Sequence, residues 1–324
     1  MRVLVVTSEW PCQRFPYSGI FVFQEVSNLR MAGLDVEVFN FRGSMQPLNY
    51  MFAWLRLRYH LMKRKYDIIH AQFGQSGLIV LPSPSPLVVT FRGSDLQGIV
   101  NRNEQYTLAG SILRRASRLV ASRASEIVVV SEKLRSQLPN RHVHVIPSGI
   151  DLDLFKPMAQ EIARERLGFS PTKRFALFAA DPNDPVKRYE LACLAVDRAR
   201  EKVPSLELLV THQVPHQQMP LYMNASDVLL LTSFHEGSSN VVKEALACNL
   251  PIVSVDVGDV RERINLLDGC LVCSDDSPEQ ISRALEHILV TNRRTNGRQR
   301  ILDLSWESTV QKLINVYDKA LNCK

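Results

Sequence analysis

Short, continuous apolar runs that alternate with stretches of helical period are the feature that most constrains this chain. The first set of runs lies at residues 3–6, 36–39, 68–71, 87–90, 127–130 and 143–146. The second set lies at residues 176–179, 206–210, 228–231, 252–255 and 271–272. Because β-branched residues fill these runs without polar alternation, they indicate parallel strands that are covered on both faces. The pattern predicts an α/β class with doubly wound parallel sheets.

The 324 residues correspond to about two domains of ordinary size. The two sets of strands meet near Gly149, in a segment with Pro147 and Ser148. We therefore predict an N-terminal domain at 1–149, a second domain at 150–304 and a final helix within 305–324. Since doubly wound sheets bind ligands at the carboxyl ends of their strands, two such domains facing each other would form a binding cleft.

The composition indicates the class of protein and the cellular compartment. Hydrophobic residues make up 45% and charged residues 22%, as in soluble globular proteins, and the net charge of +6 favours an anionic partner. The strand-like start and the 6 scattered cysteines predict a cytoplasmic protein without a signal peptide. No apolar run approaches the roughly 18 residues of a membrane span. Cys270 and Cys273 lack a second pair at zinc spacing, so we interpret them as ordinary thiols.

The most informative segment is 234–248, which directly follows a predicted strand. Residues 237–240 form a small polar loop before a helix that begins near Val241, with Ser239 or Asn240 as its N-cap. Free backbone N–H groups and the helix dipole make such a loop an anion site. Glu236 and Glu244 stand on either side of it, where carboxylates can accept hydrogen bonds from sugar or ribose hydroxyls. The two glutamates alone are equally compatible with a loop carboxylate and a solvated helix face.

The Glu-x7-Glu pattern followed by residues 245–254 resembles the donor site of family-4 retaining glycosyltransferases, which have the GT-B fold of two Rossmann-like domains. This group includes many bacterial polysaccharide and glycolipid enzymes. Further segments resemble the same family in the same order, and they lie at 67–74, 90–95, 127–131, 145–155, 185–188 and 256–260. The similarity covers residues 1–321 and implies a nucleotide diphosphate sugar as donor.

The resemblance also implies roles for individual residues. Glu244 should bind the ribose, Glu236 the transferred sugar and Lys187 the diphosphate, with Glu236, Lys187 and Arg92 as the catalytic group. Further donor contacts are expected from Gly19, Arg188, Gly237, Ser238, Ser239, Asn240 and Val241. His70, Arg92 and Asp95 are expected on the acceptor side.

Two positions depart from the family pattern. Asp181 stands where an arginine usually clamps the diphosphate, and we expect its carboxylate to point away, with Arg188 as a substitute cation. Arg92 replaces a histidine near the reactive face of the sugar, and it stays protonated, so it cannot act as a general base. It could bind an anionic group of donor or acceptor, or it could simply pair with Asp95.

The family chemistry needs no metal or other cofactor, because Lys187 and the helix N-terminus can stabilise the leaving diphosphate. The acceptor's proton would pass to the departing phosphate, without a protein nucleophile. Asp151-Leu152-Asp153 spells the metal-binding DxD of the other glycosyltransferase fold, and we interpret it as coincidence in the linker.

The acceptor is less well determined. Leu48, Met51, Phe52, Leu55, Tyr59 and Met62 share one helical face, and basic residues surround them. This helix could lie on the inner face of an anionic membrane or simply pack on its own sheet. We predict a metal-independent hexosyltransferase with a glycan, lipid-linked or small-molecule acceptor and no nucleic-acid partner. A nucleotide-sugar epimerase or a noncatalytic nucleotide- or sugar-binding protein are the alternatives.

Overall fold

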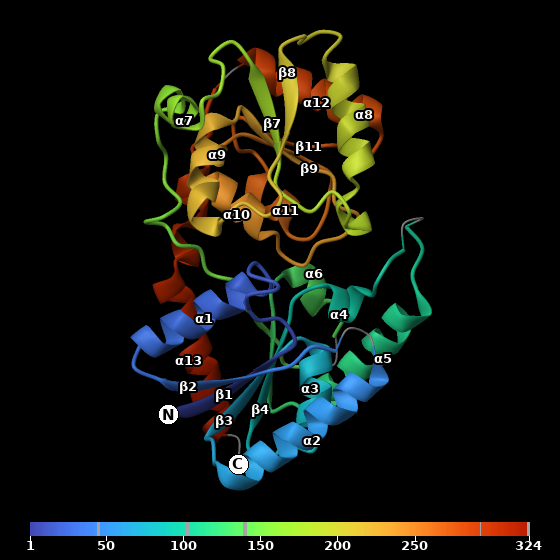
Figure 1. The fold of residues 1–324 in the computed structure, drawn as a ribbon, viewed down its shortest axis with the longest axis vertical. Helices are drawn as coiled ribbons and strands as arrows, with labels where there is room; N and C mark the ends of the chain where they lie inside the picture. Colours follow the sequence, from blue (N-terminus) through green and yellow to red (C-terminus); the bar gives the residue numbers. More distant parts are fainter. Residues whose placement is uncertain (44–45, 102–103, 139–140, 292, 323–324) are drawn as a thin grey trace. The chain divides into compact units, whose positions relative to one another are not determined.

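The computed structural model describes residues 1–324 except 44–45, 102–103, 139–140, 292 and 323–324, and it forms two compact units (Figure 1). The N-terminal domain comprises Met1–Val100, Gln105–Gly149 and Trp306–Lys324, and the C-terminal domain comprises Asn101–Glu104 and Ile150–Ser305. The chain therefore returns to the N-terminal domain for its last helix, α13 (Trp306–Asn322).

The N-terminal domain is built on a six-stranded parallel sheet in the order β2-β1-β3-β4-β5-β6. Its strands are β1 (Arg2–Thr7), β2 (Asp35–Asn40), β3 (Ile68–Gln72), β4 (Leu87–Phe91), β5 (Glu126–Val129) and β6 (His144–Val145). Each forms at a predicted apolar run, and the edge strand β6 is the shortest.

Helices cover both faces of this sheet because alternate residues of each strand point to opposite sides. Val3 and Val5 of β1 pack with α1 (Ile20–Met31) and α13, which run next to each other in Figure 1. Leu4 and Val6 belong to the core on the other face. That face is covered by α2 (Pro47–Lys63), α3 (Gly74–Val80) and α5 (Leu108–Arg123). The short helices α4 (Ser94–Gln97) and α6 (Glu132–Arg135) follow β4 and β5.

The C-terminal domain repeats this plan with a five-stranded parallel sheet in the order β11-β10-β9-β7-β8. Its strands are β7 (Arg174–Phe178), β8 (Leu206–Val210), β9 (Val228–Leu231), β10 (Ile252–Ser254) and β11 (Cys270–Val272). Its α-helices are α7 (Gln160–Leu167), α8 (Tyr189–Ala199), α9 (Met219–Ala225), α10 (Asn240–Ala247), α11 (Val260–Ile264) and α12 (Pro278–Thr291). Three 3-10 helices complete it: η1 (Pro185–Lys187), η2 (His216–Gln218) and η3 (Gly297–Leu304).

Both sheets reverse their direction of winding at an internal strand. In the N-terminal domain β1 lies between β2 and β3, and in the C-terminal domain β7 lies between β8 and β9. The predicted class of two doubly wound parallel α/β domains is therefore confirmed. Because ligands bind where the strand order reverses, the loops after β7 and β9 are the first place to search for a site. Among the described residues, no helix combines the length and apolar character that a bilayer crossing requires.

Candidate functional site in the C-terminal domain

The loops after β7 and β9 are joined to each other at the reversal point of the C-terminal sheet. Lys187 ends η1 in the first loop, and Glu236 lies in the second. The Phe234 N–H donates to the Val186 carbonyl at 2.8 Å, and the Thr232 hydroxyl donates to the Lys187 carbonyl at 2.8 Å. These backbone contacts fix the two loops together, so Lys187 and Glu236 meet in a defined geometry.

Lys187 and Glu236 form an ion pair with 2.6 Å between Nζ and Oε1. The Ser233 hydroxyl donates to the same oxygen at 2.8 Å. Burial alone would raise the pKa of Glu236, but the charge and hydrogen bond of Lys187 outweigh it and hold that pKa below its ordinary value. Burial likewise opposes the charge on Lys187, and the adjacent Glu236 raises the pKa of Lys187 in spite of it. Both groups are therefore charged, and a cation is available beside the loop that precedes α10.

The second glutamate of the pattern, Glu244, is on α10 and has a histidine as its partner. The Nε2 atom of His216 lies 3.0 Å from Oε1 of Glu244. Burial would lower the pKa of His216, but the hydrogen bond and charge of Glu244 raise it. The ring of His216 also packs edge-to-face on Phe155, with 5.1 Å between the centroids. No motif in the sequence singles out this histidine, although its position after β8, at the carboxyl edge of the sheet, is a usable signal.

The N-terminus of α10 lies between the two glutamates. Its N-cap is Ser239, as predicted, but no side-chain hydrogen bond caps the helix there. Ser238 donates instead to Oδ2 of Asp259 at 2.7 Å. Within the described part of the chain, Oδ1 of Asn240 and Nε2 of His235 are buried without a hydrogen-bond partner. Uncapped helix amides and unsatisfied polar atoms in one loop are the properties expected of a site for a polar ligand.

The neighbouring glycine turn after β10 packs directly against this loop. Gly258 has a φ of 54°, and a Cβ atom there would lie 3.1 Å from the Gly237 carbonyl oxygen and 3.1 Å from Cβ of Glu236. A side chain at residue 258 would therefore push the loop that carries Glu236.

Asp181 and Arg188 both form hydrogen bonds with groups of their own domain. Oδ1 of Asp181 accepts the backbone N–H of Asn183 at 2.9 Å, so the carboxylate stabilises its own turn. The Arg188 guanidinium donates to the Thr232 carbonyl at 2.7 Å and to Asp276 at 2.6 Å, and only 9% of the side chain is exposed. Lys187, not Arg188, is thus the cation that faces Glu236.

Arg92 does not pair with Asp95 in the N-terminal domain, so that alternative is wrong. Its guanidinium lies 2.7 Å from Glu25, donates to Ser148 at 2.7 Å and contacts Oε1 of Gln72. Glu25 comes from α1, as a lone carboxylate on the buried face of a predicted helix, which is the signal the sequence offered. With 8% of its side chain exposed, Arg92 is a structural cation in this arrangement and has little surface for an acceptor.

The other two residues expected on the acceptor side are also buried. His70 has no exposed surface, and its ring nitrogens bond to the Tyr317 and Thr90 hydroxyls at 2.7 Å each. Burial lowers the pKa of His70 to about 4, with Glu25 opposing and Arg92 adding to the effect. Asp95 accepts backbone N–H groups from residues 92, 93 and 96 at the start of α4. The expectation that His70 and Asp95 contact an acceptor is not met, because both side chains are used inside the fold.

Gly19 is the N-cap of α1 and has a φ of 67°. A Cβ atom there would lie 2.5 Å from the carbonyl oxygen of Glu9, so only glycine fits. The backbone of this loop therefore packs closely on the segment at Glu9, and the contact of Gly19 with a diphosphate stays a prediction.

Two further motifs have structural explanations. Oδ1 of Asp151 accepts the N–H groups of Asp153 and Leu154 at 3.1 and 2.8 Å, so this carboxylate of the DxD sequence stabilises a turn. Cys270 and Cys273 are buried free thiols, and burial raises the pKa of each to about 11. The sixth cysteine, Cys323, lies outside the described residues.

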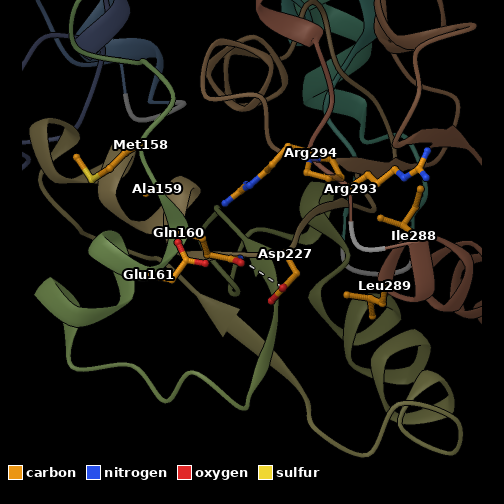
Figure 2. Close-up of a pocket in the computed structure, with 10 residues that line it drawn as sticks. Met158, Ala159, Gln160, Glu161, Asp227, Ile288, Leu289, Arg293 and Arg294 are labelled. Carbon is orange, nitrogen blue, oxygen red and sulfur yellow. Dashed lines mark hydrogen bonds between the residues drawn. The ribbon is translucent and has the colours of Figure 1, made fainter.

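A pocket of about 330 Å³ lies elsewhere in the C-terminal domain (Figure 2). Asp227, just before β9, and Gln160 form part of its lining and are joined by a 3.3 Å hydrogen bond. Because Asp227 precedes its strand, this pocket is at the amino ends of the sheet. It is distinct from the loops that carry Lys187 and Glu236.

Both domains match known protein families. Residues 1–154 match the model of the family described as Glycosyltransferase Family 4, and residues 177–291 match Glycosyl transferases group 1. A Bacillus subtilis protein named teichuronic acid biosynthesis glycosyltransferase TuaC is 26% identical, over 80% of this chain and 82% of its own length. D-inositol 3-phosphate glycosyltransferase 1 of Catenulispora acidiphila is 27% identical, over 79% of this chain and 73% of its own.

Solved structures show the same fold at low identity. Sucrose-phosphate synthase from Thermosynechococcus elongatus has a TM-score of 0.82 at 17% identity, with all of both chains covered. Anabaena HepE in complex with UDP has a TM-score of 0.68 at 17% identity, covering 97% of this chain and 99% of its own. With family models matched in both domains, the chain is a glycosyltransferase of the GT-B fold, whose N-terminal domain is of the family 4 type and whose C-terminal domain is of the group 1 type.

Proposed function

We propose that this protein is a retaining glycosyltransferase that moves a sugar from a nucleotide diphosphate sugar to an acceptor hydroxyl. The observation that carries the proposal is the arrangement of Glu236 and Glu244 on either side of the uncapped N-terminus of α10, where Lys187 holds the first and His216 the second. Anabaena HepE, which shares the fold, has been solved with UDP-glucose. Among the names of the relatives, teichuronic acid biosynthesis supports a glycan acceptor, and D-inositol 3-phosphate supports a small-molecule acceptor.

In the proposed complex the donor replaces two of the ion-pair contacts. The ribose hydroxyls donate to Glu244 in place of His216, and the transferred sugar donates to Glu236. The diphosphate meets the first amides of α10, where the helix dipole favours negative charge. Lys187 then shifts its Nζ from Glu236 toward the phosphate oxygens. Gly19 and Arg92, the contacts expected from the N-terminal domain, stay predictions.

The reaction breaks the bond between the anomeric carbon and the phosphate oxygen, and it forms a bond from that carbon to the acceptor oxygen on the same face. The acceptor's proton passes to the departing phosphate oxygen, so atoms and charge balance. Negative charge grows on the diphosphate as the bond breaks, and Lys187 and the α10 amides would stabilise it. Because these groups supply the positive charge, we propose that no metal is needed.

The test is turnover of a panel of nucleotide diphosphate sugars by the full chain, with and without EDTA, followed by NMR of the anomeric proton. Retention of configuration, unchanged by EDTA, is the expected result. Conversion of the donor into an isomer would indicate an epimerase instead. Tight nucleotide binding without turnover on any acceptor would indicate a noncatalytic binding protein.

A binding experiment tests the site assignment separately. Glu244→Ala should weaken donor affinity about tenfold or more, since a hydrogen bond to a charged group contributes about 1.5–3 kcal/mol. Glu207→Ala is the control, because this glutamate of β8 is 45% exposed and pairs with Lys173, which directly precedes β7. Equal donor affinity in the two variants would remove Glu244 from the ribose site.

We further propose that α2 contacts an anionic membrane surface. Ala53 and Leu57 pack into the core, whereas Phe52, Leu55 and Met62 are 58%, 50% and 84% exposed. Basic residues lie along the same helix and just after it, at 56, 58 and 63–65. An exposed apolar face with flanking lysines and arginines suits a lipid surface. At such a surface the enzyme would meet a lipid-linked acceptor.

Flotation of the protein with anionic vesicles at moderate salt tests this contact. The double variant Phe52→Ser with Leu55→Ser should lose vesicle binding, whereas Leu194→Ser, which alters a 54% exposed leucine of the C-terminal domain, should not. Absence of binding by the unaltered protein would refute the membrane contact and leave the glycosyltransferase proposal standing.

A further inference from the structure

Two histidines and a glutamate gather at the edge of the N-terminal sheet, away from the candidate donor site. Glu126 opens β5, His144 opens β6, and His142 comes two residues before His144. One ligand atom from each of the three lies within 4.8 Å of the others. No function discussed above uses these residues.

Strand register explains why Glu126 and His144 meet. Residues Val128 and His144 are partners in the parallel pairing of β5 with β6. Glu126 and Val128 are alternate residues of β5, so the side chains of Glu126 and His144 share one face of the sheet. His142 precedes β6, and its Nδ1 atom lies 3.9 Å from the Glu126 carboxylate. The meeting of Glu126 with His144 thus follows from the backbone and not from a chance meeting of long side chains.

The distances are close to those of a metal site. Nε2 of His144 lies 2.6 Å from Oε2 of Glu126, and Nδ1 of His142 lies 3.9 Å from the same oxygen. Ligands bound to zinc at about 2.0–2.2 Å in a tetrahedron are about 3.3–3.6 Å apart. The first distance would have to open and the second to close by less than about 1 Å. The ligand nitrogens of the two histidines, which lie within 4.8 Å of each other, would have to approach by up to about 1.5 Å. His142, with 76% of its side chain exposed, is free to make that adjustment.

We propose that Glu126, His142 and His144 form a binding site for a divalent transition metal, with Zn²⁺ as the probe. Two neutral imidazoles and one carboxylate give three protein ligands, and water completes the tetrahedron. A simple ion pair would need only His144, and it would not account for the ring of His142, which packs on that of His144 with 4.8 Å between the centroids. A metal uses both rings in their neutral form.

A bound ion would join the two-residue edge strand β6 to β5. The chain continues from β6 to Ser148, whose hydroxyl accepts from Arg92. The site would therefore stabilise the edge of the N-terminal sheet. Its effect would be measured as a higher unfolding temperature of the full chain.

Calorimetric titration of the metal-stripped full chain with ZnCl₂, together with thermal unfolding, tests the proposal. We expect one equivalent to bind and the unfolding temperature to rise with added zinc. His142→Ala should weaken binding by at least about tenfold and remove the temperature shift, because loss of even an outer-shell partner costs about 10–100-fold. His287→Ala, which alters an exposed histidine on α12, should change neither.

His142→Ala is the decisive variant because its side chain is mostly exposed, so loss of binding cannot be ascribed to misfolding. Glu126→Gln, which keeps the size of the side chain, should also weaken binding. Co²⁺ loaded in place of zinc should give visible absorption that disappears in His142→Ala. No stoichiometric zinc binding, or binding that His142→Ala leaves unchanged, would overturn the proposal.

Discussion

The two domains share one sheet plan, yet they use the polar groups near their reversal points in opposite ways. In the N-terminal domain the Arg92–Glu25 pair is buried, with side chains 8% and 4% exposed. In the C-terminal domain the Lys187–Glu236 pair is 27% and 14% exposed, and its loop retains unsatisfied polar atoms. The same topology therefore supplies a buried ion pair in one domain and a partly exposed one in the other.

The difference follows from where the residues stand on their elements. His70, Gln72 and Thr90 are within β3 and β4, so helices on both faces of the sheet cover them. Lys187 and Glu236 come after their strands, in loops beyond the covering helices. Functional groups placed on loops at the end of a packed sheet remain accessible while the sheet holds them in position.

Removal of Glu25 should have the largest effect on stability. Glu25→Ala leaves the Arg92 guanidinium buried without its carboxylate, and breaking a buried pair in this way costs about 3–5 kcal/mol. Denaturant unfolding of the full chain measures this loss. The control is Glu132→Ala, whose pair with Arg135 is about half exposed and should cost about 1 kcal/mol or less. Similar losses in the two variants would contradict the description of the Arg92–Glu25 pair as a buried ion pair.

Lys187→Ala should instead leave the fold intact and reduce turnover about 10²–10³-fold, the typical effect of losing one group that stabilises transition-state charge. Steady-state kinetics with the preferred donor and circular dichroism provide the two readouts. Lys202→Ala is the matched control, because Lys202 is 72% exposed and pairs with Glu286 far from the loop. Full turnover in Lys187→Ala would show that the pair with Glu236 is structural, as in the other domain.

Two glycines with the same left-handed backbone conformation, one in each domain, allow the stability cost of an added Cβ atom to be compared. Gly19 has a φ of 67° and Gly168 a φ of 68°, but only Gly19 meets a neighbour, the Glu9 carbonyl, where a Cβ would be. Gly168→Ala should cost about 1–2 kcal/mol for the left-handed backbone, and Gly19→Ala should cost more because the loop must also shift. Thermal unfolding measures both. A smaller loss of stability in Gly19→Ala than in Gly168→Ala would contradict the close packing of Gly19 on the Glu9 carbonyl.

The smallest expected effect is a pH dependence of the His216–Glu244 pair. Burial lowers and Glu244 raises the pKa of His216, with a net rise above its ordinary value of 6.5. The stabilisation is therefore complete below pH 6.5 and is lost as the pH rises through the raised value. For a pair this close to the surface it should amount to about 1 kcal/mol or less.

The measurement is the difference in unfolding free energy between the unaltered protein and Glu244→Gln across this range. The difference should shrink as the pH rises. Glu286→Gln is the control, since its lysine partner belongs to a type that stays charged at these pH values. A difference that stays constant would mean that His216 does not titrate as part of this pair.

The fold could be predicted from the sequence because buried parallel strands leave a direct pattern. Every apolar run became a strand, and only 143–146 shortened noticeably, to the two residues of β6. The loop at 237–241 and the start of α10 were also readable, since strand, small residues and helix follow each other in sequence. Each of these features depends on residues that are adjacent in the sequence, so it can be predicted without knowledge of distant contacts.

The partners of the charged residues were not readable, because they come from distant segments. The sequence suggests the nearby Asp95 as a salt-bridge partner for Arg92. In the structure Arg92 pairs with Glu25 of α1, and backbone N–H groups bond to Asp95. His216 and Ser233 likewise acquire their roles only when separate loops are brought together. Sequence shows which groups can be charged, whereas the sheet order decides which of them meet.

The last helix has a consequence for how the protein is made. Tyr317 of α13 is fully buried in the N-terminal domain and bonds to His70 of β3, at the centre of the first sheet. During synthesis this sheet emerges from the ribosome long before α13, whereas the C-terminal domain, with its final segment at Ser305, is complete by then. We therefore expect one face of the nascent N-terminal sheet to be covered by α1 alone until α13 is made, and the domain translated second to finish folding first.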